Sequence, residues 1–186
     1  PINSRFENKI LKYLNKNLHK YDMVIVNDYG HGLLTKKLIK TICKKSKFLA
    51  VNAQINAGNQ GFNLITKYKG ASYYSLDIDE AKRAIEDKFI DSEKIPDSIL
   101  KLTKGNSVSI TMGHKGSISK KLNKSSFTMP SFTNVVVDTM SAGDAFFVMS
   151  AMMMYLSKSV KLASFIGNLA GAITVGVPGC VPIDKS

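Results

Sequence analysis

Cysteine and histidine, the residues that build disulfide frameworks and zinc sites, are scarce in this sequence. Its 186 residues include two cysteines, Cys43 and Cys180, and three scattered histidines. Two cysteines so far apart match no disulfide framework and no zinc-ligand spacing, and they favour a reducing compartment. We therefore expect a cytoplasmic protein whose fold depends on neither disulfides nor zinc.

Long apolar runs are also missing. The most apolar segment, residues 145–156, is shorter than the roughly 20 apolar residues that span a bilayer. The N-terminus leads directly into an amphipathic helical pattern, without the apolar core of a signal peptide. The sequence predicts no membrane partner.

Acidic residues are few. Asp and Glu number 14 against 26 Lys and Arg, which gives a formal net charge of +12. Such an excess can indicate nucleic-acid binding. The lysines, however, are spread along the chain rather than gathered on one element, and basic and aromatic residues do not interleave. We expect no nucleic-acid partner, but a positive field that assists anionic substrates such as a nucleotide and a sugar phosphate.

Helical and strand patterns alternate along the chain. At this length, with 44% hydrophobic residues, one domain with a real core is expected. Alternation of this kind predicts a mainly parallel α/β sheet with helices on both faces, whose ligands bind beyond the carboxyl ends of the strands. The expected strands lie at 23–26, 48–51, 71–76, 107–112, 117–122, 126–129 and 135–137. The expected helices begin at Ser4, with a Ser4–Glu7 capping box, at Thr35, at Asp79, at Pro96, at Gly143 and at Val160.

The segment Asp138-Thr139-Met140-Ser141-Ala142-Gly143-Asp144 is the most informative stretch. It lies between the expected strand at 135–137 and a long apolar helix, so its backbone N–H groups gather at a helix N-terminus, where anions bind. Asp144 adds a carboxylate beside this anion site, a combination suited to phosphoryl transfer. A helix that merely begins with small residues and an acid would give the same pattern. A Walker A sequence is absent, which excludes a P-loop NTPase.

The whole segment resembles the D-T-x-G-A-G-D signature of the ribokinase-like (PfkB) carbohydrate kinases, with Ser141 where that family usually has Gly or Ala. The resemblance implies a three-layer α/β/α fold and the use of ATP and Mg²⁺. It also implies that Asp144 is the catalytic base and that the amides of Ala142, Gly143 and Asp144 form an anion hole.

Two earlier loops carry the resemblance further, although either could be an ordinary polar turn. Asp28-Tyr29-Gly30-His31-Gly32 resembles a loop of the heptose-phosphate kinase branch. The amide-rich segment from Asn52 to Asn59 resembles a segment of PfkB domains associated with nucleotide-activated sugar synthesis. The resemblance places Asp28, Gly30 and Asn52 on the substrate side.

Three further positions match the family on the nucleotide side. Asp77 and Glu80 correspond to its N-x-x-E motif, which implies a Mg²⁺ site that acts through water, although helix-start acids also serve as dipole partners. Residues 111–116 resemble its T-L-G-x-x-G hairpin, which implies that Thr111, Gly113 and Gly116 border the nucleotide; a generic β-hairpin is the alternative. Asn168, in a small-residue helix, is a further expected nucleotide neighbour.

The sequence therefore predicts residues 1–186 to be the C-terminal part of a ribokinase-like kinase domain that lacks the N-terminal part of the fold. The expected activity is ATP-dependent phosphoryl transfer to a hydroxyl of a sugar or sugar phosphate. The alternative is a non-catalytic nucleotide-binding or assembly module. Because the sugar-holding strands of the family do not precede Pro1, we expect either a missing N-terminal half or a homo-oligomer.

Overall fold

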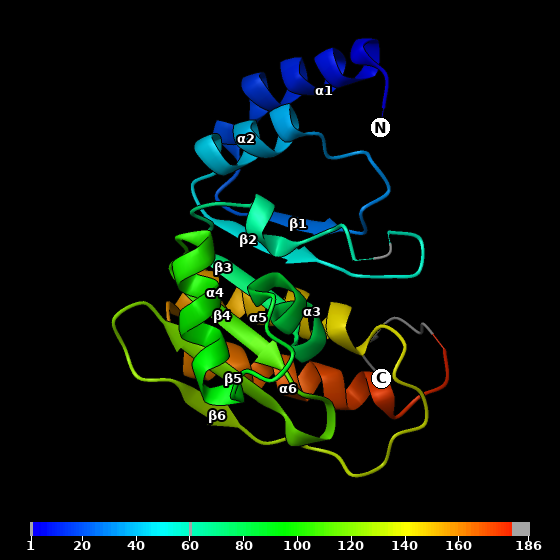
Figure 1. The fold of residues 1–186 in the computed structure, drawn as a ribbon, viewed down its shortest axis with the longest axis vertical. Coiled ribbons are helices and arrows are strands. Elements are labelled where there is room, and N and C mark those ends of the chain that lie inside the picture. The colour runs from blue at the N-terminus through cyan, green and yellow to red at the C-terminus, as the bar shows by residue number, and fades with distance from the viewer. Residues whose placement is uncertain (1, 60, 180–186) are drawn as a thin grey trace.

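The computed structural model describes residues 2–59 and 61–179, and it is built around a single six-stranded sheet (Figure 1). The strands lie side by side in sequence order. Strands β1 to β4 pair in parallel, whereas β5 is antiparallel to both of its neighbours, β4 and β6. Their bounds are β1 Val24–Asp28, β2 Leu49–Ala53, β3 Tyr73–Asp77, β4 Ser107–Thr111, β5 Ser117–Lys121 and β6 Phe127–Met129. The mainly parallel sheet is confirmed.

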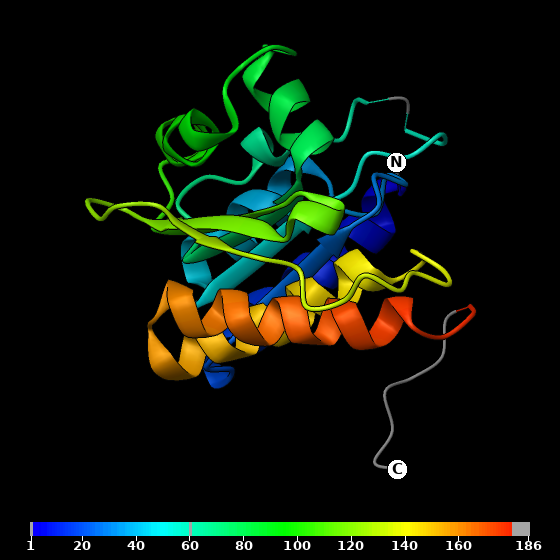
Figure 2. The same cartoon turned by 90° about the horizontal axis from the view of Figure 1, so that it is seen from below.

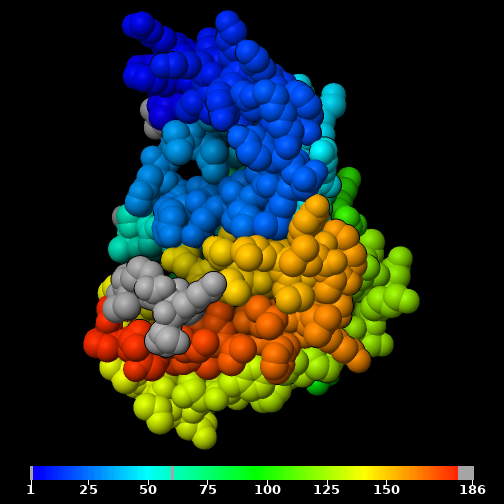
Figure 3. Space-filling view, turned by 180° about the vertical axis from the view of Figure 1, so that it is seen from behind, coloured from blue at the N-terminus to red at the C-terminus, as the bar shows by residue number. Residues whose placement is uncertain are grey.

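Helices cover both faces of this sheet. In Figure 2 the sheet separates α3 and α4 on one side from α5 and α6 on the other, and Figure 3 shows α5 and α6 lying side by side across the back. The helices are α1 Ser4–Asn17, α2 Lys36–Lys45, α3 Ile78–Ile85, α4 Ile95–Thr103, α5 Ala142–Ser157 and α6 Val160–Val175, with short 3₁₀ turns η1 Leu18–Lys20, η2 Ile65–Lys67, η3 Ser92–Lys94 and η4 Gly113–Lys115. The three-layer α/β/α architecture is confirmed.

Two apolar clusters follow from the alternation of side chains along each strand. On β2, Leu49 and Val51 face the front cluster beneath α2, α3 and α4, whereas Ala50 faces the back. The back cluster joins Ala50 and Tyr73 to Phe147 of α5. Each strand thus sends alternate side chains to opposite layers, which decides which residues can reach the candidate site.

The structure corrects two local expectations. The N-cap of α1 is Asn3, whose side chain accepts the Phe6 N–H, and not Ser4; Glu7 instead accepts hydrogen bonds from Thr35 and Lys37 of the neighbouring α2 segment. Residues 135–137 form no strand, because they are exposed and the Val137 N–H donates to the carbonyl of Val175, not to a sheet neighbour. On α5, Phe146, Phe147 and Met154 are buried, whereas Met149 and Met152 are exposed.

Two further points concern the chain as a whole. In residues 2–59 and 61–179, every helix is too short or too polar to cross a bilayer. Cys43 is a free thiol, whereas Cys180 lies outside the described residues.

Candidate active site

The N-terminus of α5 lies beyond the carboxyl ends of β1 to β4. Ser141, the residue before the helix, has φ 65°, a left-handed conformation that lets the chain turn sharply into α5. In the first turn, the Ala142 N–H makes a long 3.3 Å contact with the carbonyl of Thr139. The amides of Gly143 and Asp144 follow at the open end of the helix, where N–H groups have no intrahelical acceptor. This arrangement can bind an anion.

Three side chains converge on the Asp144 carboxylate. Oδ1 accepts hydrogen bonds from Nδ2 of Asn27 at 2.8 Å and from Nε2 of Gln54 at 2.7 Å. Oδ2 accepts a longer one, at 3.3 Å, from the Tyr29 hydroxyl. These donors come from the ends of β1 and β2, and they fix the orientation of the carboxylate.

Sequence reasoning did not assign Asn27 and Gln54 to this site. It chose Asp28, but successive residues of a strand point to opposite faces. Asn27 therefore faces α5 and Asp144, while Asp28 faces the front layer. The signal that could have found Asn27 is strand parity, since Ile25 belongs to the cluster beneath α5.

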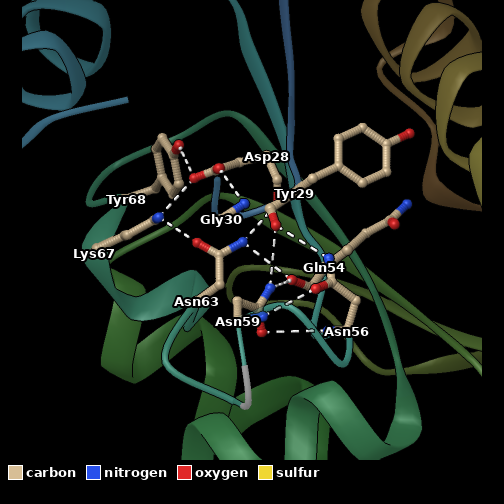
Figure 4. A network of polar contacts seen from close by, with 9 residues as sticks. All are labelled: Asp28, Tyr29, Gly30, Gln54, Asn56, Asn59, Asn63, Lys67 and Tyr68. Carbon is tan, nitrogen blue, oxygen red and sulfur yellow. Dashed lines mark hydrogen bonds and ion pairs between the residues drawn. The ribbon is translucent and has the colours of Figure 1, made fainter. Parts of the chain in front are cut away.

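Asp28 lies in a buried polar network on the opposite side of β1 (Figure 4). Its carboxylate accepts the Tyr68 hydroxyl at 2.7 Å and the Gly30 N–H at 2.9 Å, and it pairs with the Lys67 ammonium at 2.6 Å. Burial opposes ionisation of Asp28, but these three donors together hold the pKa of its carboxyl below the usual value. This role is structural, and substrate contact by Asp28 stays a prediction.

The same network fixes the loop that carries Gln54. Nδ2 of Asn63 donates to the carbonyls of Asp28 and Gln54, and Nδ2 of Asn59 donates to the carbonyls of Gln54 and Tyr29. In Figure 4 the Gln54 side chain extends away from the network while its backbone is held within it. The amide-rich segment thus acts mainly through side-chain to backbone bonds, and these leave the Gln54 amide available to Asp144.

A cavity of about 440 Å³ opens beside the start of α5. Most of the expected nucleotide-side residues line it, together with the helix N-terminus: Thr111, Gly113, Asn168, Ala142, Gly143 and Asp77. Gly116 does not line it. A Cβ at Gly116 would lie 2.0 Å from the carbonyl oxygen of Met129, so this glycine is required by the close approach of β6.

Asn168 has a fixed orientation at the edge of this cavity. Its Nδ2 donates to the Ser164 carbonyl at 2.8 Å and to Oγ of Ser117 at 2.7 Å. The carbonyl can only accept, so the side-chain oxygen of Asn168 lies on the opposite side of the amide.

A second, smaller cavity of about 170 Å³ shares Asp77, Thr111 and Gly143 with the first and adds Asn52 and Glu80. Asp77 and Glu80 form a capping box at the start of α3, and Oε1 of Glu80 also accepts the Ile55 N–H at 3.0 Å. Burial raises the pKa of Glu80 to about 7; the nearby charges of Asp77 and Asp144 add to this, against the two backbone N–H donors.

The small cavity fits a hydrated cation. Nδ2 of Asn52 donates to the Ser75 carbonyl, while its buried Oδ1 has no hydrogen-bond partner among the described residues. Each oxygen of Glu80 accepts one backbone N–H, which leaves lone pairs for water. Carboxylate and amide oxygens that bind through water suit Mg²⁺, which keeps most of its hydration shell.

Residues 3–185 match the pfkB family of carbohydrate kinases. Because this match covers most of the chain, the chain belongs to this family. Curated relatives are named bifunctional protein HldE: that of Campylobacter jejuni subsp. doylei is 26% identical over 180 residues, which are 95% of this chain and 38% of the relative. The protein of that name from Nitratiruptor sp. is 26% identical over 96% of the chain and 37% of the relative. The chain thus spans little more than a third of the length of these relatives.

Solved structures show the same fold. Phosphofructokinase-2 from Escherichia coli, in complex with potassium, superposes with a TM-score of 0.80 at 12% identity, over 96% of this chain and 58% of that one. A ribokinase from Arabidopsis thaliana, complexed with ribose and ATP, superposes with a TM-score of 0.69 at 19% identity, over 92% of this chain and 54% of that one. The ribokinase-like fold is therefore established, over somewhat more than half of those structures.

Proposed function

We propose that this chain carries the nucleotide-binding and catalytic portion of an ATP-dependent phosphotransferase that acts on a hydroxyl of a sugar or sugar phosphate. The observation that carries the proposal is the position of Asp144. Its carboxylate lies in the first turn of α5, next to the helix amides, and Gly143 borders both cavities. A proton acceptor beside an anion site is what phosphoryl transfer to a hydroxyl requires.

In the proposed mechanism, Asp144 accepts the proton of the attacking hydroxyl as the oxygen bonds to the γ-phosphorus and the bond to ADP breaks. Asn27 and Gln54 hold the carboxylate in place through Oδ1. The amides of Gly143 and Asp144 stabilise charge on the transferring phosphoryl, and the Ala142 amide joins them by giving up its long contact with Thr139.

The proposed nucleotide site is the larger cavity, with Thr111, Gly113 and Asn168 beside the nucleotide. Mg²⁺ held through water near Asp77 and Glu80 would neutralise charge on the nucleotide phosphates. Asn52 and Gly30 stay predictions as substrate-side residues; Asn52 borders the small cavity, whereas Gly30 lies in the Asp28 network.

Two observations support a proposal for the acceptor class. The chain belongs to the pfkB family of carbohydrate kinases, which supports a sugar acceptor in general terms, and the loop at residues 28–32 resembles a loop of the heptose-phosphate kinase branch. We propose a small phosphorylated sugar as the acceptor.

The test is Asp144→Asn in the natural full-length protein that contains this chain. Turnover is expected to fall about 10²–10⁴-fold, because proton transfer is lost, while the affinity for ATP stays nearly unchanged. A correctly folded Asp144→Asn protein with near-normal turnover would show that Asp144 is not the base. If the unsubstituted protein binds ATP and yet phosphorylates no sugar, the alternative of a non-catalytic nucleotide-binding module is favoured.

A further inference from the structure

A second hollow, of about 510 Å³, lies away from the proposed catalytic site, between α2 and the segment around η2. Five lysines line it: Lys36, Lys40 and Lys44 from α2, with Lys67 and Lys69 opposite. We call it the lysine groove. None of the described residues that line it is acidic. The lysines that look dispersed along the sequence are therefore gathered here by the fold.

The three lysines of α2 repeat at intervals of four residues, so their side chains share one face of the helix. Like charges at this spacing repel one another. Lys36 also begins the helix, and the first turn of α2 contains no acidic residue. Positive charge at a helix N-terminus is unfavourable with respect to the helix dipole. The fold thus concentrates positive potential along one side of α2.

Few acidic side chains neutralise the positive charges of the groove lysines. Lys67 forms the 2.6 Å ion pair with Asp28, and the Lys69 ammonium donates to the carbonyl of Leu102, which leaves its charge in place. In the part of the chain that the structure describes, Lys36, Lys40 and Lys44 form no ion pair. Lys37, which does not line the groove, pairs with Glu7.

The groove also has an apolar part. Leu34, Ile39 and Cys43 line it between the lysines, and Ile39 is buried. Burial raises the pKa of the Cys43 thiol, so this side chain is neutral. A hollow with an apolar base and a cationic rim fits a molecule with an uncharged body and several negative charges.

We propose that the lysine groove binds a small organic phosphate, a sugar or nucleoside that carries two or more phosphate charges. Its volume lies within the roughly 300–1,000 Å³ of small-molecule sites. No aromatic side chain lines it among the described residues, whereas single-stranded nucleic acids bind to surfaces with aromatic stacking platforms. The proposal does not rest on the proposed kinase activity, because Asp144 and both cavities near it lie elsewhere.

The test uses fructose 1,6-bisphosphate as the probe, in calorimetric titrations of the chain near physiological salt. The variant Lys36→Gln/Lys40→Gln/Lys44→Gln removes the three positive charges that α2 contributes to the lysine groove. The matched control Lys9→Gln/Lys12→Gln/Lys16→Gln removes the same number of exposed charges from α1. A Gly143→Leu background keeps the cavity beside α5 from contributing, and circular dichroism confirms that each variant is folded.

We expect the α2 variant to weaken binding of the bisphosphate at least ten-fold and the α1 control to change it less than two-fold. Equal weakening by both variants would mean diffuse attraction to a basic chain and would overturn the proposal. So would the absence of measurable binding to the unsubstituted chain. Preferential binding of a single-stranded oligonucleotide, lost in the α2 variant, would also overturn it in favour of a nucleic-acid surface.

Discussion

Glu80 is a carboxyl with only 6% of its surface exposed, and its pKa is raised to about 7, chiefly by burial. A raised pKa in the folded state means that the folded protein binds the proton more tightly than the unfolded chain does. The contribution of Glu80 to stability is therefore fully present below 4.5, the ordinary pKa of a glutamate side chain, and is lost as the pH rises to about 7.

We predict that the free energy of unfolding falls between these pH values by a Glu80 contribution on the order of 3 kcal/mol. Glu80→Gln should flatten this part of the profile because an amide does not titrate, although the NH₂ group that replaces one carboxyl oxygen cannot accept the backbone N–H that this oxygen accepts. Urea unfolding of both proteins at several pH values is the measurement. Parallel pH profiles for the two proteins would contradict the prediction.

Asn27 shows where residue-scale prediction from sequence reaches its limit. The motif that ends at Asp144 correctly predicted that a helix begins there, whereas the catalytic role of Asp144 stays a prediction. The hydrogen-bond partners of the Asp144 carboxylate depend on which face of β1 each side chain lies on. The sequence favoured the acidic Asp28 as a site residue, whereas the neutral Asn27 beside it is the one that contacts Asp144. The side that a strand residue faces is decided by the layers packed against it, which local sequence reveals only weakly.

At the scale of elements, the described residues of the loop after β2, 54–59 and 61–63, are held by side-chain amides rather than by apolar packing. Asn63 has only 1% of its surface exposed, and its Nδ2 donates to the carbonyls that end β1 and begin this loop. The loop should therefore order or loosen as a unit, together with the Gln54 side chain that reaches Asp144.

We predict that Asn63→Ala destabilises the protein by about 1–3 kcal/mol, because buried carbonyls lose donors. It should also increase backbone hydrogen exchange through the loop, measured by NMR or mass spectrometry. The control Asn134→Ala changes an exposed asparagine and should shift stability by less than about 0.5 kcal/mol. Unchanged exchange in the loop of a folded Asn63→Ala protein would contradict this role.

The secondary structure of the described residues was largely predictable because its strands and helices have clear apolar periodicity and capping signals. Residues 135–137 were the exception. Three β-branched residues favour a strand by propensity, but a strand requires a partner, and β6 already ends the sheet on that side.

At the scale of the whole molecule, α5 has an exposed apolar stripe that includes Val148, Met149, Met152 and Leu156. Among the strands of the described residues, β1 forms one edge of the sheet and pairs with β2 alone. An apolar surface beside an open sheet edge favours association. This chain spans 54–58% of the solved ribokinase-like structures cited above, and we propose that the remainder of such a fold covers this surface.

We predict that the 186-residue chain self-associates at concentrations of about 100 µM and phosphorylates no sugar efficiently by itself. Met152→Glu/Leu156→Glu should shift it towards monomer, whereas Phe89→Glu, on an exposed loop away from α5, should not. Sedimentation velocity and a coupled kinase assay over a panel of sugars are the measurements. A monomeric chain with robust sugar-specific turnover would contradict the prediction.

The proposed function depends most on the open N-terminus of α5 as the place that holds nucleotide phosphates. A Cβ at Gly143 would meet no atom within 4 Å, so a larger side chain has open space to enter, and Gly143→Leu also replaces a helical glycine with a better helix former. Calorimetric titration with ATP and Mg²⁺ should show binding to the unsubstituted chain. Gly143→Leu should show none, with a melting temperature that is equal or higher. Equal ATP affinity in both proteins would contradict this role of the helix N-terminus.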